Sequence, residues 1–180
     1  MKIITPEILE LTEIRKAAVT LKNVAEVTPL IKSFTYSNLF GAQVLLKRED
    51  LQQVRSYKIR GAYNKISSLT KAESARGIVC ASAGNHAQGV AYSCNKLKIY
   101  GTIFMPSPTP KQKIEQVQMF GGDYITIELI GDTFDDAQKA ANQACEKQSK
   151  VFVHPFNDQK IIEGQATVGL EILKQTEQPI

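Results

Sequence analysis

Short apolar runs alternate with longer amphipathic stretches along most of this chain. The run Ile78 to Ala81 has no charged or amide side chain, which is typical of a strand buried in a parallel sheet. Further strands are predicted at Gln43 to Lys47, Ile99 to Met105, Asp123 to Leu129 and Lys150 to Val153. The pattern therefore predicts five strands, each followed by a polar or glycine-containing turn.

Between these runs, apolar residues recur at the three- and four-residue spacing of a helix face. One such stripe consists of Ile59, Ala62, Tyr63, Ile66 and Leu69, with Ser56 as the predicted N-cap. Other helices are predicted from Thr5-Pro6 to Leu21, at Thr35 to Phe40, at Lys71 to Arg76, through Leu97, up to Phe120, after Asp132 or Thr133, and from Asp158 to about Thr176. We expect glycines at 41 and 77 to end two of them.

Strands that alternate with helices over short connections predict an α/β fold, with a parallel sheet covered by helices on both faces. The printed sequence ends at Gln178-Pro179-Ile180, where the pattern would place another strand. We therefore expect the sheet formed by these 180 residues to be incomplete.

Composition excludes several classes of function. The net charge of +4 is spread along the chain without a basic run interleaved with aromatics, so nucleic acid is not an expected partner. No apolar run approaches the roughly 20 residues that span a membrane, and Met1 to Glu7 lacks a signal-peptide core. Three cysteines without metal-ligand spacing and only two histidines predict reduced thiols, no metal site and a cytoplasmic protein.

Lys58 is the first candidate for chemistry because it lies near the start of the helix predicted after Ser56. The positive potential of a helix N-terminus favours a neutral amine over an ammonium ion. A neutral lysine attacks aldehydes and forms a Schiff base. The alternative is a solvated surface lysine, which is the more common role of such a residue.

Ser82-Ala83-Gly84-Asn85-His86 is the second candidate, because it joins a buried strand to a helix start. Ligands of open α/β sheets bind beyond the carboxyl ends of the strands. Gly84 allows the backbone to approach a ligand closely, and free N–H groups at a helix start favour an anion. Asn85 can cap the helix or hydrogen-bond a ring substituent. A simple helix cap is the alternative for this turn.

Taken together, the two motifs closely resemble fold-type II pyridoxal-phosphate enzymes, whose fold is that of tryptophan synthase β. Ser-Tyr-Lys-Ile-Arg-Gly-Ala precedes Ser-Ala-Gly-Asn-His-Ala-Gln-Gly by some two dozen residues. Within those enzymes the chain resembles the threonine dehydratase (threonine ammonia-lyase) group. The resemblance extends to Lys47-Arg48-Glu49-Asp50, Met105-Pro106, Phe120-Gly121-Gly122 and Gly164-Gln165.

The resemblance implies a role for each candidate residue. Lys58 forms the Schiff base with pyridoxal 5′-phosphate and later moves the proton at Cα of the amino-acid substrate. Asn85 hydrogen-bonds the 3′-oxygen of the cofactor, and Tyr57 packs near its pyridine ring, where the group usually has phenylalanine. Ser82, Ala83, Gly84 and His86 belong to the loop that receives the substrate carboxylate, mostly through backbone N–H groups. Arg60 is implied to be an ion-pair partner rather than a catalyst.

The implied reaction is β-elimination, which converts L-threonine to 2-oxobutanoate and ammonia in isoleucine biosynthesis or threonine catabolism. A serine dehydratase or serine racemase is the second enzyme hypothesis. Racemases of this kind carry a second serine as a base where this chain has Ala83, which favours the dehydratase. The non-enzyme hypothesis is a truncated α/β module without catalytic activity.

The resemblance also implies a division of the chain into parts of a larger enzyme. Residues 1–50 would begin the large lobe, residues 51–155 would form the small lobe, and residues 156–180 would return to the large lobe. The glycine-rich loop that binds the cofactor phosphate in this family has no counterpart in the printed sequence. We therefore expect an N-terminal portion with impaired activity alone, and a homo-oligomer for the full-length family.

Overall fold

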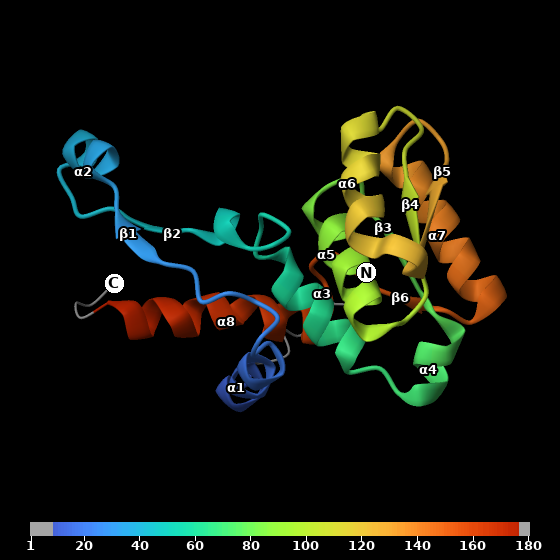
Figure 1. Ribbon diagram of the computed structural model, residues 1–180, viewed down its shortest axis with the longest axis horizontal. Coiled ribbons are helices and arrows are strands. Elements are labelled where there is room, and N and C mark those ends of the chain that lie inside the picture. The colour runs from blue at the N-terminus through green and yellow to red at the C-terminus, as the bar shows by residue number, and fades with distance from the viewer. Residues whose placement is uncertain (1–8, 177–180) are drawn as a thin grey trace, which may run out of the picture.

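A computed structural model describes residues 9–176 (Figure 1). The larger of its two parts is built on a four-stranded sheet with the order β5-β4-β3-β6. The strands are β3 (Ile78–Ala81), β4 (Gly101–Met105), β5 (Ile125–Leu129) and β6 (Val151–Phe152). All neighbours in this sheet pair in parallel, so the predicted α/β class is confirmed.

Helices cover both faces of this sheet, as the sequence predicts (Figure 1). On one face lie α3 (Lys58–Ser67), α5 (Asn85–Leu97) and α6 (Lys111–Gly121). The other face is covered by α7 (Phe134–Gln148), and the short helix α4 (Lys71–Arg76) leads into β3. Two single 3₁₀ turns occur at Glu49–Leu51 and Gly122–Tyr124.

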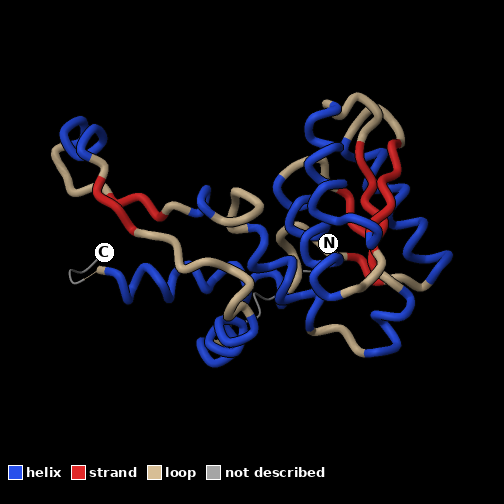
Figure 2. The backbone as a smooth tube through the Cα atoms, viewed as in Figure 1, coloured by secondary structure: helices blue, strands red, loops and turns tan. Residues whose placement is uncertain are grey.

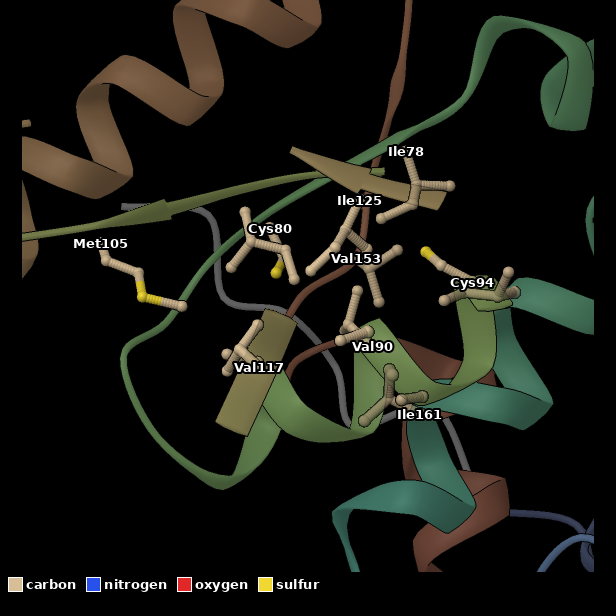
Figure 3. Close-up of a cluster of buried hydrophobic side chains, with 14 residues drawn as sticks. Ile78, Cys80, Val90, Cys94, Met105, Val117, Ile125, Val153 and Ile161 are labelled. Atoms are coloured by element: carbon tan, nitrogen blue, oxygen red, sulfur yellow. The ribbon is translucent and has the colours of Figure 1, made fainter. Parts of the chain in front are cut away.

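The alternation of side chains along β3 divides the apolar core into two layers. Ile78 and Cys80 pack with α5 and α6, where Figure 3 shows Val90 and Val117 directed toward the sheet. Val79 and Ala81 point to the other face and pack against α7. The central strand is therefore buried on both faces, which explains its lack of charged residues.

The three cysteines are free, as predicted. Cys80 and Cys94 are buried in the larger core layer, and Cys145 on α7 is half-buried. Burial raises the pKa of the Cys94 thiol to about 12, so this group is a neutral thiol at physiological pH.

The second part of the molecule is an arm that extends away from the sheet (Figure 2). It contains the antiparallel pair β1 (Leu30–Lys32) and β2 (Leu45–Lys47), joined through α2 (Phe34–Phe40). Beneath it run α1 (Leu11–Thr20) and the long helix α8 (Gln159–Gln175), which contacts both α1 and α3.

Placing the run Gln43 to Lys47 in the parallel sheet was therefore wrong. Its last three residues form β2 and pair only with β1, a strand that the sequence pattern did not reveal. A three-residue strand is too short to show which partner it will choose, and partner choice depends on burial that this exposed arm lacks.

Several predicted helix ends are confirmed, and two caps were wrong. Asp158 caps α8 through the backbone N–H groups of residues 160 and 161, and Thr133 caps α7. Ser56 does not cap α3, because the N-cap position is held by Tyr57 without a side-chain hydrogen bond. The N-cap of α5 is Gly84 rather than Asn85. The predicted start at Thr5-Pro6 lies outside the described residues.

Within residues 9–176, none of the helices is long and apolar enough to cross a membrane. No group of three or more histidine, cysteine, aspartate or glutamate residues in that range could hold a metal ion.

Candidate active site

The order of the strands places the carboxyl ends of β3 and β6 side by side, and we call the region beyond these two ends the crevice. From β3 the chain moves through β4 to β5 on one side, and α7 then carries it back to β6 on the other side of β3. The loops that leave β3 and β6 lead to α5 and α8, which pack in the same core layer. Ligands of open α/β sheets bind beyond the carboxyl ends of the strands.

A close crossing of two helices brings Lys58 to this crevice. A Cβ atom on Gly89 of α5 would lie 3.0 Å from the Lys58 carbonyl oxygen and 3.2 Å from the Ile59 nitrogen. Only glycine therefore lets the first turn of α3 approach the first turns of α5 this closely. The start of α3 and the loop after β3, which are about 25 positions apart in sequence, become neighbours.

The Lys58 side chain is held by two contacts at this crevice. Its Nζ donates a hydrogen bond of 2.7 Å to the carbonyl oxygen of Pro155, which follows β6. The same Nζ lies 5.3 Å from the centroid of the Tyr57 ring. Partial burial lowers the pKa of the Lys58 amine from its ordinary value. The direction agrees with the neutral amine predicted from the sequence, and the cause found in the structure is loss of hydration.

The loop Ser82-Ala83-Gly84-Asn85 lies on the other side of the crevice and is partly open. Ser82 Oγ accepts a hydrogen bond of 3.3 Å from the Gly84 N–H, and Ala83 packs against the apolar core. Nothing lies within 4 Å of the position that a Cβ atom of Gly84 would take. Asn85 is exposed at the start of α5. The loop thus offers small side chains and a helix start to a ligand.

His86 differs from its neighbours because its side chain turns into the protein. It is 4% exposed, and its Nε2 lies 3.0 Å from the carbonyl oxygen of Val153. Because that partner only accepts, Nε2 carries the proton and Nδ1 is a lone-pair acceptor. Nδ1 is buried without a hydrogen-bond partner among the described residues. Burial lowers the pKa of His86 to about 4, so the ring is neutral at pH 7.

The structure adds His154 and Pro155 to the candidate site. They follow β6 after the single residue Val153, and Pro155 places its carbonyl oxygen on Lys58. The sequence pattern predicts a strand at Lys150 to Val153 but assigns no role to the residues after it. The rule that ligands bind at carboxyl ends of parallel strands would have pointed to them.

Arg60, two residues after Lys58, has a purely internal environment. It is 1% exposed and forms ion pairs with Glu49 at 2.8 Å and with Glu171 at 2.6 Å. Burial alone would lower the pKa of Arg60, but hydrogen bonds and charges of the two carboxylates outweigh burial and raise it. Glu171 also pairs with Lys47, so the network ties α3, α8 and the arm together. Arg60 is an ion-pair partner, as expected.

Two cavities flank this network. One, of about 350 Å³, is lined by Lys47, Glu49, Tyr57, Gln165 and Val168, and it opens beside the start of α3. A larger one, of about 550 Å³, lies between α1 and α8 and does not include Lys58 or the loop after β3. Volume alone therefore does not identify the reactive crevice.

Comparison with known proteins identifies the class. The sequence profile of the family described as pyridoxal-phosphate dependent enzyme matches residues 21–180. The chain belongs to this family.

Within the family, its sequence is similar to those of biosynthetic L-threonine dehydratases. It is 50% identical to that of Bacillus subtilis (strain 168) over 166 residues, which are 92% of this chain and 39% of the relative. The relative from Mycobacterium bovis is 46% identical over 92% of this chain and 38% of its own length. The chain spans about two fifths of the curated relatives that it matches.

Solved structures agree with the fold. The processed form of threonine deaminase isoform 2 from Solanum lycopersicum superposes with a TM-score of 0.83 at 40% identity, over 93% of this chain and 47% of that one. Serine racemase from Dictyostelium discoideum gives a TM-score of 0.85 at 29% identity, over 94% and 54%. The fold-type II architecture predicted from the motifs is confirmed.

The described residues fit one end of pyridoxal phosphate. Lys58 provides an amine of lowered pKa for the aldehyde, and open space adjoins Gly84. Two of the buried polar atoms without a hydrogen-bond partner, Ser56 Oγ and His86 Nδ1, belong to these same segments. The glycine-rich loop that would hold the phosphate has no counterpart in the printed sequence. The fit therefore covers the aldehyde and ring end of the cofactor.

Proposed function

We propose that this chain carries the reactive lysine of a pyridoxal-phosphate dependent β-elimination, which converts L-threonine to 2-oxobutanoate and ammonia. The observation that carries the proposal is the place of Lys58, whose amine contacts the loop after β6 and whose backbone lies against α5, the helix that follows the loop after β3. Similarity to biosynthetic L-threonine dehydratases supports the choice of substrate and a role in isoleucine biosynthesis. A cytoplasmic location and homo-oligomerisation of the full-length protein belong to the same proposal.

Lys58 has two tasks in this proposal. It would hold pyridoxal phosphate through the aldehyde carbon of the cofactor, and its free amine would accept the proton that leaves substrate Cα. Both tasks need an uncharged amine, which burial of Lys58 favours. When bound, pyridoxal phosphate supplies the electron sink that stabilises negative charge at that carbon.

The loop after β3 orients the substrate in this proposal. Ser82, Ala83, Gly84 and His86 receive the substrate carboxylate through backbone N–H groups at the start of α5, where the helix dipole favours an anion. The inward direction of the His86 ring is consistent with a contribution from its backbone alone. Asn85 and Tyr57, both exposed, hold the cofactor ring.

Racemisation or dehydration of serine is the second candidate, and the serine racemase folds favour keeping it. Racemisation needs a base on each face of substrate Cα. Lys58 occupies one face in the proposal, and Ala83 has no group that can accept a proton on the other. Turnover of L-serine without formation of D-serine would separate a serine dehydratase from a racemase.

The division into lobes at residues 50 and 156 stays a prediction. In the proposal, residues 51–155 close over the cofactor, while residues 1–50 and 156–180 belong to the lobe that completes the phosphate site. The Arg60 network, which joins Glu49 to Glu171, would then lie at the junction between the lobes.

A chimera tests the proposed reaction. Residues 1–180 are joined to the segment of the Bacillus subtilis relative that lies beyond the matched region, and 2-oxobutanoate is measured with L-threonine and pyridoxal phosphate. We expect turnover that the substitution Lys58→Ala abolishes and that Lys96→Ala leaves in place, since Lys96 is an exposed lysine of α5 outside the crevice. Equal turnover by the Lys58→Ala chimera would refute the role of Lys58.

The non-catalytic alternative applies to the 180 residues by themselves. Because they contain no glycine-rich loop for the phosphate, we expect them to bind pyridoxal phosphate weakly and to release little ammonia from threonine. Cofactor titration with size-exclusion chromatography measures this. Tight binding with ammonia release would show that the isolated chain is a complete enzyme.

A further inference from the structure

The proposed function leaves unused the segment from Val153 to Asn157, which connects β6 to α8. One of its carbonyl oxygens, that of Pro155, accepts the hydrogen bond from Lys58. The segment is not a regular element, so its shape depends on side chains that hold it. Those side chains are the two histidines of the chain.

His154 holds the turn that follows it. Its Nδ1 accepts hydrogen bonds from the backbone N–H groups of Asn157 at 2.8 Å and of Phe156 at 3.2 Å. The His154 ring also meets the Phe156 ring edge-on, with centroids 4.6 Å apart. Pro155 lies inside this turn, so the direction of its carbonyl is set by the same contacts.

His86 holds the beginning of the segment. Its Nε2–H donates to the Val153 carbonyl, and the Val153 N–H donates to Val79 in β3 at 2.8 Å. The far end is anchored by Asp158, which caps α8 and forms an ion pair with Lys65 of α3 at 2.7 Å. With both ends anchored, the turn around His154 is the variable part of the path to Pro155.

We propose that His154 is a positioning residue for Lys58: its unprotonated Nδ1 shapes the turn that presents the Pro155 carbonyl to the lysine amine, and a proton on Nδ1 releases that amine. This inference rests on the proposed function only in that Lys58 is taken as the reactive amine. His154 touches neither substrate nor cofactor in this role.

A proton on His154 Nδ1 is incompatible with the hydrogen bonds that hold the turn. Two backbone N–H groups converge on Nδ1, and a protonated Nδ1 would direct a third N–H toward them. The charged groups that act on His154 are Asp158, which favours its protonation, and Lys58, which opposes it, while His86 is a neutral neighbour. Burial and Lys58 together keep the pKa of His154 below its ordinary value, so the turn is intact at pH 7.

Selective labelling tests the proposal without catalysis. The chain is treated with limiting pyridoxal phosphate, reduced with borohydride and mapped by peptide mass, and the label on Lys58 is divided by the label on Lys96, an exposed lysine of α5. His154→Phe keeps an aromatic ring but removes the acceptor. We expect His154→Phe to lower the Lys58 to Lys96 ratio about tenfold. The variant loses the two hydrogen bonds to His154 Nδ1 that hold the turn, and each is of ordinary net strength.

The matched variant His154→Asn restores an acceptor, because an asparagine oxygen can bind backbone N–H groups two residues on. It should retain the wild-type ratio at pH 7.5. Because the pKa of His154 lies below 6.5, its proton binds only well below that pH, and there the wild-type ratio should fall while that of His154→Asn stays level. This second comparison does not depend on whether His154→Phe folds.

Each result has one meaning. Equal ratios in wild type and His154→Phe, or parallel pH profiles in wild type and His154→Asn, would overturn the role of His154 and leave Lys58 as the reactive amine. A wild-type ratio near one at pH 7.5 would instead contradict the proposed function, because Lys58 would then react like any surface lysine.

Discussion

Lys58 and Arg60 are cations two residues apart on α3, and their surroundings are opposite. Arg60 is buried between two carboxylates, which raise its pKa. Lys58 is half-buried and has one neutral carbonyl as hydrogen-bond acceptor, and burial lowers its pKa. The difference shows which cation serves stability and which is kept available for reaction, because a carboxylate partner would hold the lysine amine in its charged form.

This comparison also explains why the helix is built as it is. Arg60 anchors α3 to Glu49 before it and to α8 behind it, while Gly89 brings α5 against its first turn. Lys58 is thereby held in place through the backbone rather than through its own charge.

Removal of the Arg60 charge should have the largest effect on stability. Arg60→Met leaves Glu49 partly buried without its cation and leaves Glu171 with Lys47 alone, and breaking such a buried pair typically costs about 3–5 kcal/mol of unfolding free energy. Urea denaturation measures the loss. The matched control is Arg48→Met, whose pair with Asp50 is exposed and should matter by less than about 1 kcal/mol. Similar losses in both variants would show that the buried network is not what stabilises α3.

The free energy of unfolding should depend on pH through His86, the buried neutral histidine near Lys58. Its pKa is about 4 in the folded chain against 6.5 for a free histidine, so the unfolded chain takes up the proton first as pH falls. The contribution of neutral His86 to the free energy of unfolding is therefore fully present above pH 6.5. It decreases by about 3 kcal/mol between pH 6.5 and 4.

His86→Gln provides the control, because its amide can still donate to the Val153 carbonyl but does not titrate. Its unfolding free energy should lack this contribution, and urea midpoints at several pH values measure the difference. If the two proteins lost stability in parallel, other groups would account for the acid sensitivity.

The crossing of α3 and α5 should be sensitive to a single methyl group. Gly89→Ala places a Cβ atom 3.0 Å from the Lys58 carbonyl oxygen, and such overpacking costs about 1–3 kcal/mol. Gly169→Ala in α8 is the control, because no atom lies within 4 Å of its new Cβ. There alanine should stabilise the helix by up to about 1 kcal/mol. Thermal unfolding of both variants measures the contrast, and a stable Gly89→Ala would mean that the helices can move apart.

Replacement of Lys58 should change stability least. Lys58→Met removes one partly buried amine and a single hydrogen bond, so we expect a change within about 1 kcal/mol in either direction. The same variant should lose the reducible adduct with pyridoxal phosphate on α3. A loss as large as that of Arg60→Met would place Lys58 in the supporting structure and undo the comparison.

The sequence was most informative where one local pattern determines the outcome. The apolar run of β3, the Asp158 cap of α8 and the glycine after α2 are visible in short stretches of residues, and all three are confirmed. The motif around Lys58 also led to the correct family.

What escaped prediction depends on contacts between distant segments. The pairing of β2 with β1 needs a partner that shows no periodic signal. The Ser56 cap fails because the buried Ser56 hydroxyl makes no hydrogen bond to the backbone of α3. The approach of Pro155 to Lys58 joins residues 97 positions apart through the strand order of the sheet. The roles of the individual site residues stay predictions.

The lowered pKa of Lys58 is the most direct test of the account. The lysines are dimethylated with ¹³C-formaldehyde, the Lys58 signal is assigned with Lys58→Arg, and its chemical shift is followed against pH by NMR. We predict that this amine loses its proton at a lower pH than the ordinary lysine value of 10.5. Titration of Lys58 at or above that value would contradict the role of Lys58 as the available amine.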